Sequence, residues 1–163
     1  IAIQLGKFMS KKIQARRSKI HGTGVFAKKD LVKGELVIEY KGQLRTHEDV
    51  DSAYEGLDET GHTFLFTLNQ QFVIDANIDG NEARWINHSC KANCQAVHEE
   101  NDVGDLKKDR ILIEAIRDIK AGEELTYNYG IRLAERHTAK LKKLWRCLCG
   151  SESCTGTLLQ PKK

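Results

Sequence analysis

The sequence predicts a single domain that is mostly β with a few short helices. Short runs of β-branched residues bounded by turn residues dominate the chain, whereas helical spacing of apolar residues occurs in only two places. At 163 residues, the chain can bury about two-thirds of the surface that its unfolded form exposes, so one domain accounts for its length.

Three runs are typical of β-strands, because turn residues set them off from their surroundings. They are Leu36 to Tyr40, Phe72 to Ile74 and Ile111 to Ile116. The spacing of apolar residues predicts a weak helix from His47 to Leu57 and a clearer one from Leu133 to Trp145, which leads straight into a cysteine cluster. The segment from Glu99 to Asp109 is predicted to be a polar loop.

The net charge of +3 conceals an uneven distribution. Residues 1–34 carry nine lysines and arginines against one acid, residues 35–134 ten against twenty, and residues 135–163 seven against two. The stretch 46–61 holds six acids and no lysine or arginine. A solvated helix face explains it as well as a function does, yet an acidic rim would attract a basic peptide and repel nucleic acid. We therefore expect no direct nucleic-acid recognition.

The chain carries no signal for membrane insertion or secretion. It has no apolar run of about 18 residues and no signal peptide, so we expect a soluble intracellular protein without membrane contact. Met9 is the only methionine. Two interpretations stay open: a natural start at Met9 with residues 1–8 added for expression, or a fragment of a longer protein.

Three of the five cysteines lie close together as Cys147-x-Cys149-x4-Cys154. They are too close for each to find a different distant partner, and intracellular chains seldom keep disulfides, so a metal is favoured over reduced free thiols. Tetrahedral zinc needs four ligands, and a fourth must come from elsewhere in the chain.

Five segments, in this order, resemble the SET-domain protein lysine methyltransferases, above all their trithorax-like branch. They are residues 18–26 (SKIHGTGVF), 34–42 (GELVIEYKG), 84–90 (RWINHSC), 124–129 (ELTYNY) and 147–154 (CLCGSESC). The resemblance implies a SET-domain β-clip fold with a knot-like core, in which segments 84–90 and 124–130 meet. It further implies an N-terminal flank at 1–16, a SET domain at 17–135 and a zinc-binding post-SET segment at 136–163. No cysteine-rich pre-SET region precedes the SET domain in this sequence.

By this resemblance, the fourth zinc ligand is the cysteine of the Asn-His-Ser-Cys motif. The implied ligands of one Zn²⁺ are Cys90, Cys147, Cys149 and Cys154. Cys94 is then left over, although the sequence leaves open an exchange of roles between Cys90 and Cys94. A metal that joins Cys90 to the C-terminal tail would tie this tail beside Asn87 and His88 and make it a wall of the active site.

Methyl transfer from S-adenosylmethionine to lysine requires a neutral amine. The pKa of free lysine is about 10.4, so roughly one side chain in a thousand qualifies at neutral pH. An apolar, aromatic-lined channel and a nearby sulfonium both disfavour the ammonium form. In a strand, Tyr127 and Tyr129 would point to the same face, so both phenols can line one channel.

The resemblance also assigns roles to single residues. Tyr129 corresponds to the essential tyrosine and Tyr127 to the position that governs how many methyl groups are added, and Asn87 and His88 to the pair that contacts the cofactor. The implied catalytic residues are Tyr129, Tyr127, Asn87 and His88. The implied cofactor-binding residues are His21, Gly22, Thr23, Phe64, Asn87, His88 and Leu148, the last through its backbone. Arg84 and Tyr40 are interpreted as structural or channel-supporting.

Two positions depart from the family pattern. Phe64-Leu65-Phe66 stands where the family often has Tyr-x-Phe, which removes a hydroxyl near the amine, and Ala92 replaces the usual proline after the catalytic cysteine. Tyr127 favours stopping after one methyl group, whereas Phe64 favours further transfer. Giving Tyr127 more weight, we expect mainly mono- with some dimethylation.

The resemblance predicts a protein-lysine N-methyltransferase that acts on a lysine in a basic peptide, with a histone H3 tail as the first candidate. Its location would be nuclear or chromatin-associated if histone is the substrate, and otherwise cytoplasmic. The alternatives are a catalytically silent SET module that binds peptides or partners, and a zinc-stapled structural domain without cofactor. The presence of Asn87, His88 and Tyr129 argues against a silent module.

Overall fold

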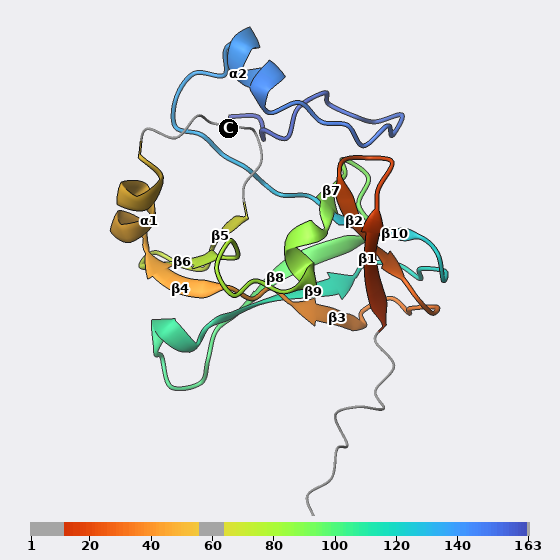
Figure 1. The fold of residues 1–163 in the computed structure, drawn as a ribbon, viewed down its shortest axis with the longest axis horizontal. Helices are drawn as coiled ribbons and strands as arrows, with labels where there is room; N and C mark the ends of the chain where they lie inside the picture. Colours follow the sequence, from red (N-terminus) through yellow and green to blue (C-terminus); the bar gives the residue numbers. More distant parts are fainter. Residues whose placement is uncertain (1–11, 56–63, 163) are drawn as a thin grey trace, which may run out of the picture.

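The computed structural model describes residues 12–55 and 64–162, and within them the fold is mostly β (Figure 1). Three small sheets carry the strands, with the orders β1-β2-β10-β7, β3-β9-β8 and β4-β6-β5. The first sheet contains β1 (Ile13–Arg17), β2 (Thr23–Ala27), β10 (Glu124–Tyr127) and β7 (Asn87–His88). The second contains β3 (Leu36–Glu39), β9 (Arg110–Ala115) and β8 (Cys94–Glu99), and the third β4 (Gln43–Thr46), β6 (Phe72–Asp75) and β5 (Leu65–Thr67). The predicted fold class is confirmed.

The three strands predicted from the sequence are present as β3, β6 and β9, with no end shifted by more than one residue. Their side chains supply much of the core, in which Ile113 of β9 is fully buried together with Val25, Ile86 and Leu125 from the first sheet and its connections. Each fully buried aliphatic side chain of this size contributes roughly 1.5–3 kcal/mol. The sequence prediction of a polar loop at 99–109 overlooked a short 3-10 helix, η3 (Leu106–Lys108).

The helix that the sequence predicts only weakly is longer than the one that it predicts clearly. The weakly predicted one forms α1 (His47–Tyr54), whose N-cap Thr46 accepts a hydrogen bond from the Asp49 backbone. The clearly predicted helix is only α2 (Ala139–Leu144). Residues before it cannot be helical, because Ile131 forms a β-bridge with Leu159 and Thr138 caps the helix.

The chain crosses itself where β7 pairs with β10. These strands are parallel, with Asn87 opposite Thr126 and His88 opposite Tyr127. The buried amide of Asn93 extends the pairing, since it donates to the Glu124 carbonyl (2.8 Å) and accepts from the Thr126 backbone (2.9 Å). The segments 84–90 and 124–130 therefore meet as predicted.

The C-terminal tail lies over one side of this crossing. Figure 1 shows α2 and the tail after it passing above β7 and the tip of the β1–β2 hairpin. Leu158 and Leu159 are buried there, and the Leu158 backbone donates to the Trp145 carbonyl (2.8 Å). None of the described helices is long and apolar enough to cross a membrane.

Candidate active site and metal site

Four cysteine sulfurs gather between β7 and the tail. The Sγ atoms of Cys90, Cys147, Cys149 and Cys154 all lie within 4.8 Å of one another, and those of Cys90 and Cys147 are 3.8 Å apart. Four thiolates at the usual Zn–S distance of about 2.3 Å lie about 3.8 Å from each other in a tetrahedron. The cluster therefore fits a zinc ion, and it consists of the four cysteines that the sequence singled out.

Cys94 lies apart from this cluster. It is on β8 and is 2% exposed, and burial raises the pKa of its thiol to about 12. Its sulfur is not part of the group of four that could share one metal ion. The structure thus favours Cys90 over Cys94 as the partner of the tail cysteines.

Asn87 holds the turn after β1 against the crossing. Its side-chain amide donates to the carbonyls of His21 (3.1 Å) and Thr23 (3.3 Å) and to Glu124 Oε1 (3.0 Å). The Ser18 hydroxyl donates to the same carboxylate oxygen at 2.7 Å. Sequence reasoning missed Glu124 and Ser18, whose partners are distant in the chain. The amide of Asn87 thus fixes the backbone of residues 21–23 beside the crossing.

His88 is oriented from both sides. Its Nδ1 accepts a hydrogen bond from the Tyr129 backbone (3.0 Å), so its proton is on Nε2, which lies 3.6 Å from Cys90 Sγ. Burial lowers the pKa of His88 to about 4, so its imidazole is neutral at physiological pH. A neutral imidazole whose N–H faces a thiolate is a common support of a metal ligand.

Aromatic rings line a cavity beside the crossing. The ring centroids of Tyr127 and Tyr129 are 4.9 Å apart, and Phe66 lies 6.2 Å from Tyr127 and 5.1 Å from Tyr40. The cavity has a volume of about 450 Å³, and Arg84, Arg132 and Trp145 also line it. The prediction that Tyr127 and Tyr129 share a channel fits this arrangement, although Tyr129 lies beyond the end of β10.

The three phenols of this cavity differ in their hydrogen bonds. The hydroxyl of Tyr129 donates to the Ile86 carbonyl (2.7 Å) and that of Tyr40 to the Phe64 carbonyl (3.1 Å). The hydroxyl of Tyr127 has no hydrogen-bond partner among residues 12–55 and 64–162. Burial raises the pKa of Tyr127 and of Tyr129, so both remain protonated.

A second, small cavity also has Tyr129 in its lining. It is lined by Ile20, His21, Asn87, His88, Tyr129, Arg146, Leu148 and Leu158. Four of the predicted cofactor-binding residues are thus together, and Gly22 and Thr23 adjoin them in the chain. Gly22 has φ +44°, which favours glycine. Tyr129 belongs to the lining of both this cavity and the aromatic one.

Phe64, expected from the sequence to bind the cofactor, lies outside both cavities. Its ring meets Trp85 edge-on at 5.0 Å, and the Arg84 guanidinium lies over Trp85 at 4.6 Å. Phe64 lines neither of these two cavities, whereas Phe66, two residues on, lines the aromatic one. Sequence reasoning also passed over Trp145 as a lining residue, because only the docked tail brings it there.

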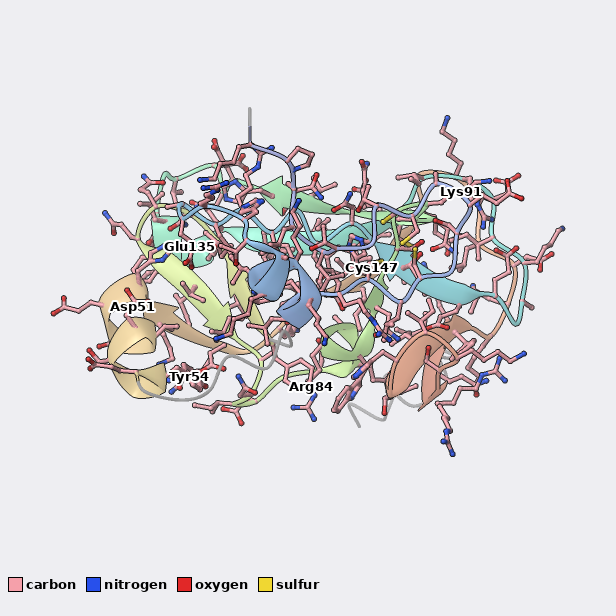
Figure 2. The ribbon with its side chains drawn as sticks, turned by 90° about the horizontal axis from the view of Figure 1, so that it is seen from above. Asp51, Tyr54, Arg84, Lys91, Glu135 and Cys147 are labelled. Atoms are coloured by element: carbon pink, nitrogen blue, oxygen red, sulfur yellow. The ribbon has the colours of Figure 1, made fainter. Side chains whose placement is uncertain are left out.

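The acidic stretch lies at the far end of the molecule. Figure 2 shows Asp51 and Tyr54 of α1 at one end, with Cys147 and Lys91 toward the other. The Tyr54 hydroxyl donates to buried Asp75 (2.7 Å), which also pairs with Arg45 (3.1 Å), so α1 is fastened to the third sheet. Asp58 and Glu59 lie outside the described residues. No acidic side chain of the described chain lines either cavity.

The crossing, the thiol cluster and the two cavities define a SET domain. The family model described as SET domain matches residues 22–130, and the chain belongs to this family. The resemblance read from the sequence is confirmed.

Curated relatives share most of this chain but are far longer. Histone-lysine N-methyltransferase set-2 of Caenorhabditis elegans is 38% identical over 159 residues, which cover 93% of this chain and 10% of the relative. Histone-lysine N-methyltransferase trithorax of Drosophila virilis is 38% identical over 139 residues, 85% of this chain and 3% of the relative. Human histone-lysine N-methyltransferase SETD1B is 37% identical over 154 residues, which cover 93% of this chain and 7% of the relative.

Solved structures show the same fold. One is described as ctPRC2 in an autoinhibited conformation bound to S-adenosylmethionine, with a TM-score of 0.67 and 37% identity over 74% of this chain and 15% of that chain. Another, the polycomb repressive complex 2 of Chaetomium thermophilum, has a TM-score of 0.65 and 38% identity. The match covers 75% of this chain and 16% of that chain.

Proposed function

We propose that this protein is an S-adenosylmethionine-dependent protein-lysine N-methyltransferase. The observation that carries the proposal is the position of Tyr129 in the lining of two cavities, one lined by aromatic rings and one by the Asn87 and His88 pair. Such a position brings one phenol to the boundary between a lysine channel and a cofactor site. The names of the relatives and the cofactor in the related ctPRC2 structure support the same reaction.

The aromatic cavity can supply a neutral amine. Its rings remove water from the lysine side chain, and the guanidinium groups of Arg84 and Arg132 on its lining disfavour a further positive charge. Both effects lower the pKa of a bound lysine from its value of about 10.4. When bound, S-adenosylmethionine supplies the methyl group as an electrophilic sulfonium.

The tyrosines orient the amine. Because the Tyr129 hydroxyl donates to the Ile86 carbonyl, its lone pairs are held in one direction and can meet the polarised methyl and amine. The free hydroxyl of Tyr127 can hold the amine or a water molecule in the same channel. Occupation of that space supports mainly mono- with some dimethylation, as the sequence predicted.

The zinc ion would be held by the four clustered cysteines and would act structurally, since a site with four thiolates leaves no open position. It would keep Leu148, which lies between two of these cysteines, on the wall of the small cavity. We assign cofactor contacts to His21, Gly22, Thr23 and Leu148, in addition to Asn87 and His88. Phe64, expected from the sequence as a further contact, packs against Trp85 outside the small cavity and is not assigned this role.

The substrate is proposed to be a lysine in a basic histone tail, with H3 first. A Candida albicans relative named as an H3 lysine-4 specific histone-lysine N-methyltransferase is 37% identical over 155 residues, which supports this choice. Acids of α1 would attract a basic segment from a distance, while the cations near the channel act on the amine itself. A chromatin location follows if the substrate is histone.

Incubation with isotopically labelled S-adenosylmethionine and a panel of histone and control peptides, read by mass spectrometry, tests the proposal. We expect labelled methyl groups on lysine, foremost in H3 peptides. Cofactor binding without transfer to any peptide would instead favour the silent peptide-binding module. Absence of cofactor binding in zinc-loaded protein would favour the structural domain.

A further inference from the structure

The exposed basic residues of the N-terminal part belong to the β1–β2 hairpin and the segment that follows it. The β1–β2 hairpin and the turn after it lie at the end opposite α1 in both views (Figures 1 and 2). Six lysines and arginines of this region are exposed: Arg16, Arg17, Lys19, Lys28, Lys29 and Lys33. We call them the hairpin cations. The acids of α1 are thus separated from this basic surface.

The hairpin cations form no close ion pairs with acids, although Lys29 interacts electrostatically with Glu35, which itself pairs with Lys12. Within residues 12–55 and 64–162, none of them forms an ion pair. Arg16 instead stacks on the Phe26 ring (3.9 Å) and donates to the Gly122 carbonyl (3.4 Å), which fixes its guanidinium on the sheet surface. The one acid of this region, Asp30, pairs with Lys120 at 3.4 Å.

Two other exposed arginines of the same domain have acidic partners. Arg110 binds Glu99, and Arg117 lies 2.9 Å from Glu123. Like charges side by side repel each other, so six exposed cations within residues 16–33 favour the approach of an anionic partner. Arg16 and Arg17 lie on β1, which is the edge strand of its sheet, and charged side chains there protect the edge from pairing with another chain. This protection does not explain Lys28, Lys29 and Lys33, which follow β2.

The spacing of these cations suits a nucleic-acid backbone. β1 has five residues and therefore spans about 17 Å at roughly 3.3 Å per residue. Arg17 and Lys19 lie at one end of the hairpin, and Lys28 lies at the other, where its backbone donates to Lys12 (2.8 Å). Because each DNA strand carries a phosphate about every 3.4 Å of helix axis, this length matches about five base pairs.

We propose that the hairpin cations form a docking surface for the phosphate backbone of double-stranded DNA. Such contacts are independent of base sequence and release counterions, so their strength falls steeply with salt. From the sequence we expected no nucleic-acid recognition, because of the acidic stretch. That stretch lies at the other end of the molecule, and salt screens its repulsion within about 8 Å at physiological ionic strength. For an enzyme acting on histones, DNA contact would also raise the local concentration of substrate.

The test is fluorescence anisotropy with a labelled 20-base-pair duplex of arbitrary sequence, measured from 50 to 200 mM NaCl without cofactor or peptide. The test variant is Lys28→Gln/Lys29→Gln. The matched control is Lys107→Gln/Lys108→Gln, which removes two adjacent exposed lysines of equal charge from η3. Thermal unfolding of both variants checks that the fold is unchanged.

We expect the test variant to bind DNA at least tenfold more weakly at 100 mM salt, and its slope of log K against log salt to decrease by about 1.8, for two lost phosphate contacts. The control should stay within twofold of the unchanged protein. Absence of binding at 50 mM, or equal losses in both variants, would overturn the proposal. So would binding to phosphatidylserine vesicles without binding to DNA. None of these results depends on methyl transfer, so they leave the proposed activity to its own test.

Discussion

Gly24 makes the most specific structural prediction, because it faces the carboxylate that holds the site together. A Cβ atom on Gly24 would lie 2.3 Å from Glu124 Oε1 and 2.9 Å from the Ser18 Cβ. In Gly24→Ala, the Glu124 side chain must therefore move away from Ser18 and Asn87. Overpacking costs about 1–3 kcal/mol, and the loss of a hydrogen bond to a charged group about 1.5–3 kcal/mol. We expect a loss of about 2–4 kcal/mol in the free energy of unfolding.

A double-mutant cycle shows whether Glu124 is the cause. Glu124→Ala removes the clashing carboxylate, so Gly24→Ala should cost at least about 1 kcal/mol less in that background than in the unchanged protein. The assay is urea unfolding of zinc-loaded protein, with the affinity for S-adenosylmethionine measured beside it. We expect weaker cofactor binding in both single variants, because Asn87 loses a fixed partner. An additive cycle, or a cost of Gly24→Ala below about 0.5 kcal/mol, would refute this account of the site.

Three further predictions concern the product, the metal and the substrate. Tyr127→Phe should shift the product toward higher methylation and Phe64→Tyr toward monomethyl-lysine only, as read from mass spectra at long reaction times; efficient trimethylation by the unchanged protein would mean that Phe64 dominates. Metal analysis should find one zinc per chain, lost in Cys90→Ser and kept in Cys94→Ser, and the opposite pattern would reassign the fourth ligand. The KM for a basic H3 peptide should rise with ionic strength while cofactor affinity changes little; a salt-insensitive KM or a preference for acidic peptides would contradict the role given to the acids of α1.

The sequence predicts those parts of the fold that local chemistry determines. The strands β3, β6 and β9 are recognisable because β-branched residues and turns mark them locally. The strand β1 is not, since only Ile13 of its five residues is buried and its order comes from pairing with β2. The helix expected from Leu133 failed for a similar reason, because the bridge between Ile131 and Leu159 overrides the local spacing.

In the site too, local motifs could be predicted from the sequence, whereas contacts between distant residues could not. The cysteine cluster and the Asn87 and His88 pair follow from motifs, and the structure brings them together. Tyr129 shares the channel with Tyr127 even though β10 ends before it, because its hydroxyl binds Ile86 and its backbone binds His88. Glu124 and Ser18 were not predicted, since 106 residues separate them and no local pattern reports their contact.

The central claim is that Tyr129 acts on the reacting groups at the boundary between the two cavities. Its most direct test is Tyr129→Phe, with cofactor affinity measured by calorimetry and turnover on an H3 peptide by mass spectrometry. The substitution removes one hydroxyl and little packing, so cofactor affinity should stay within a few-fold while kcat falls by about 100-fold or more. Turnover close to that of the unchanged protein, with the cofactor bound equally well, would contradict the account.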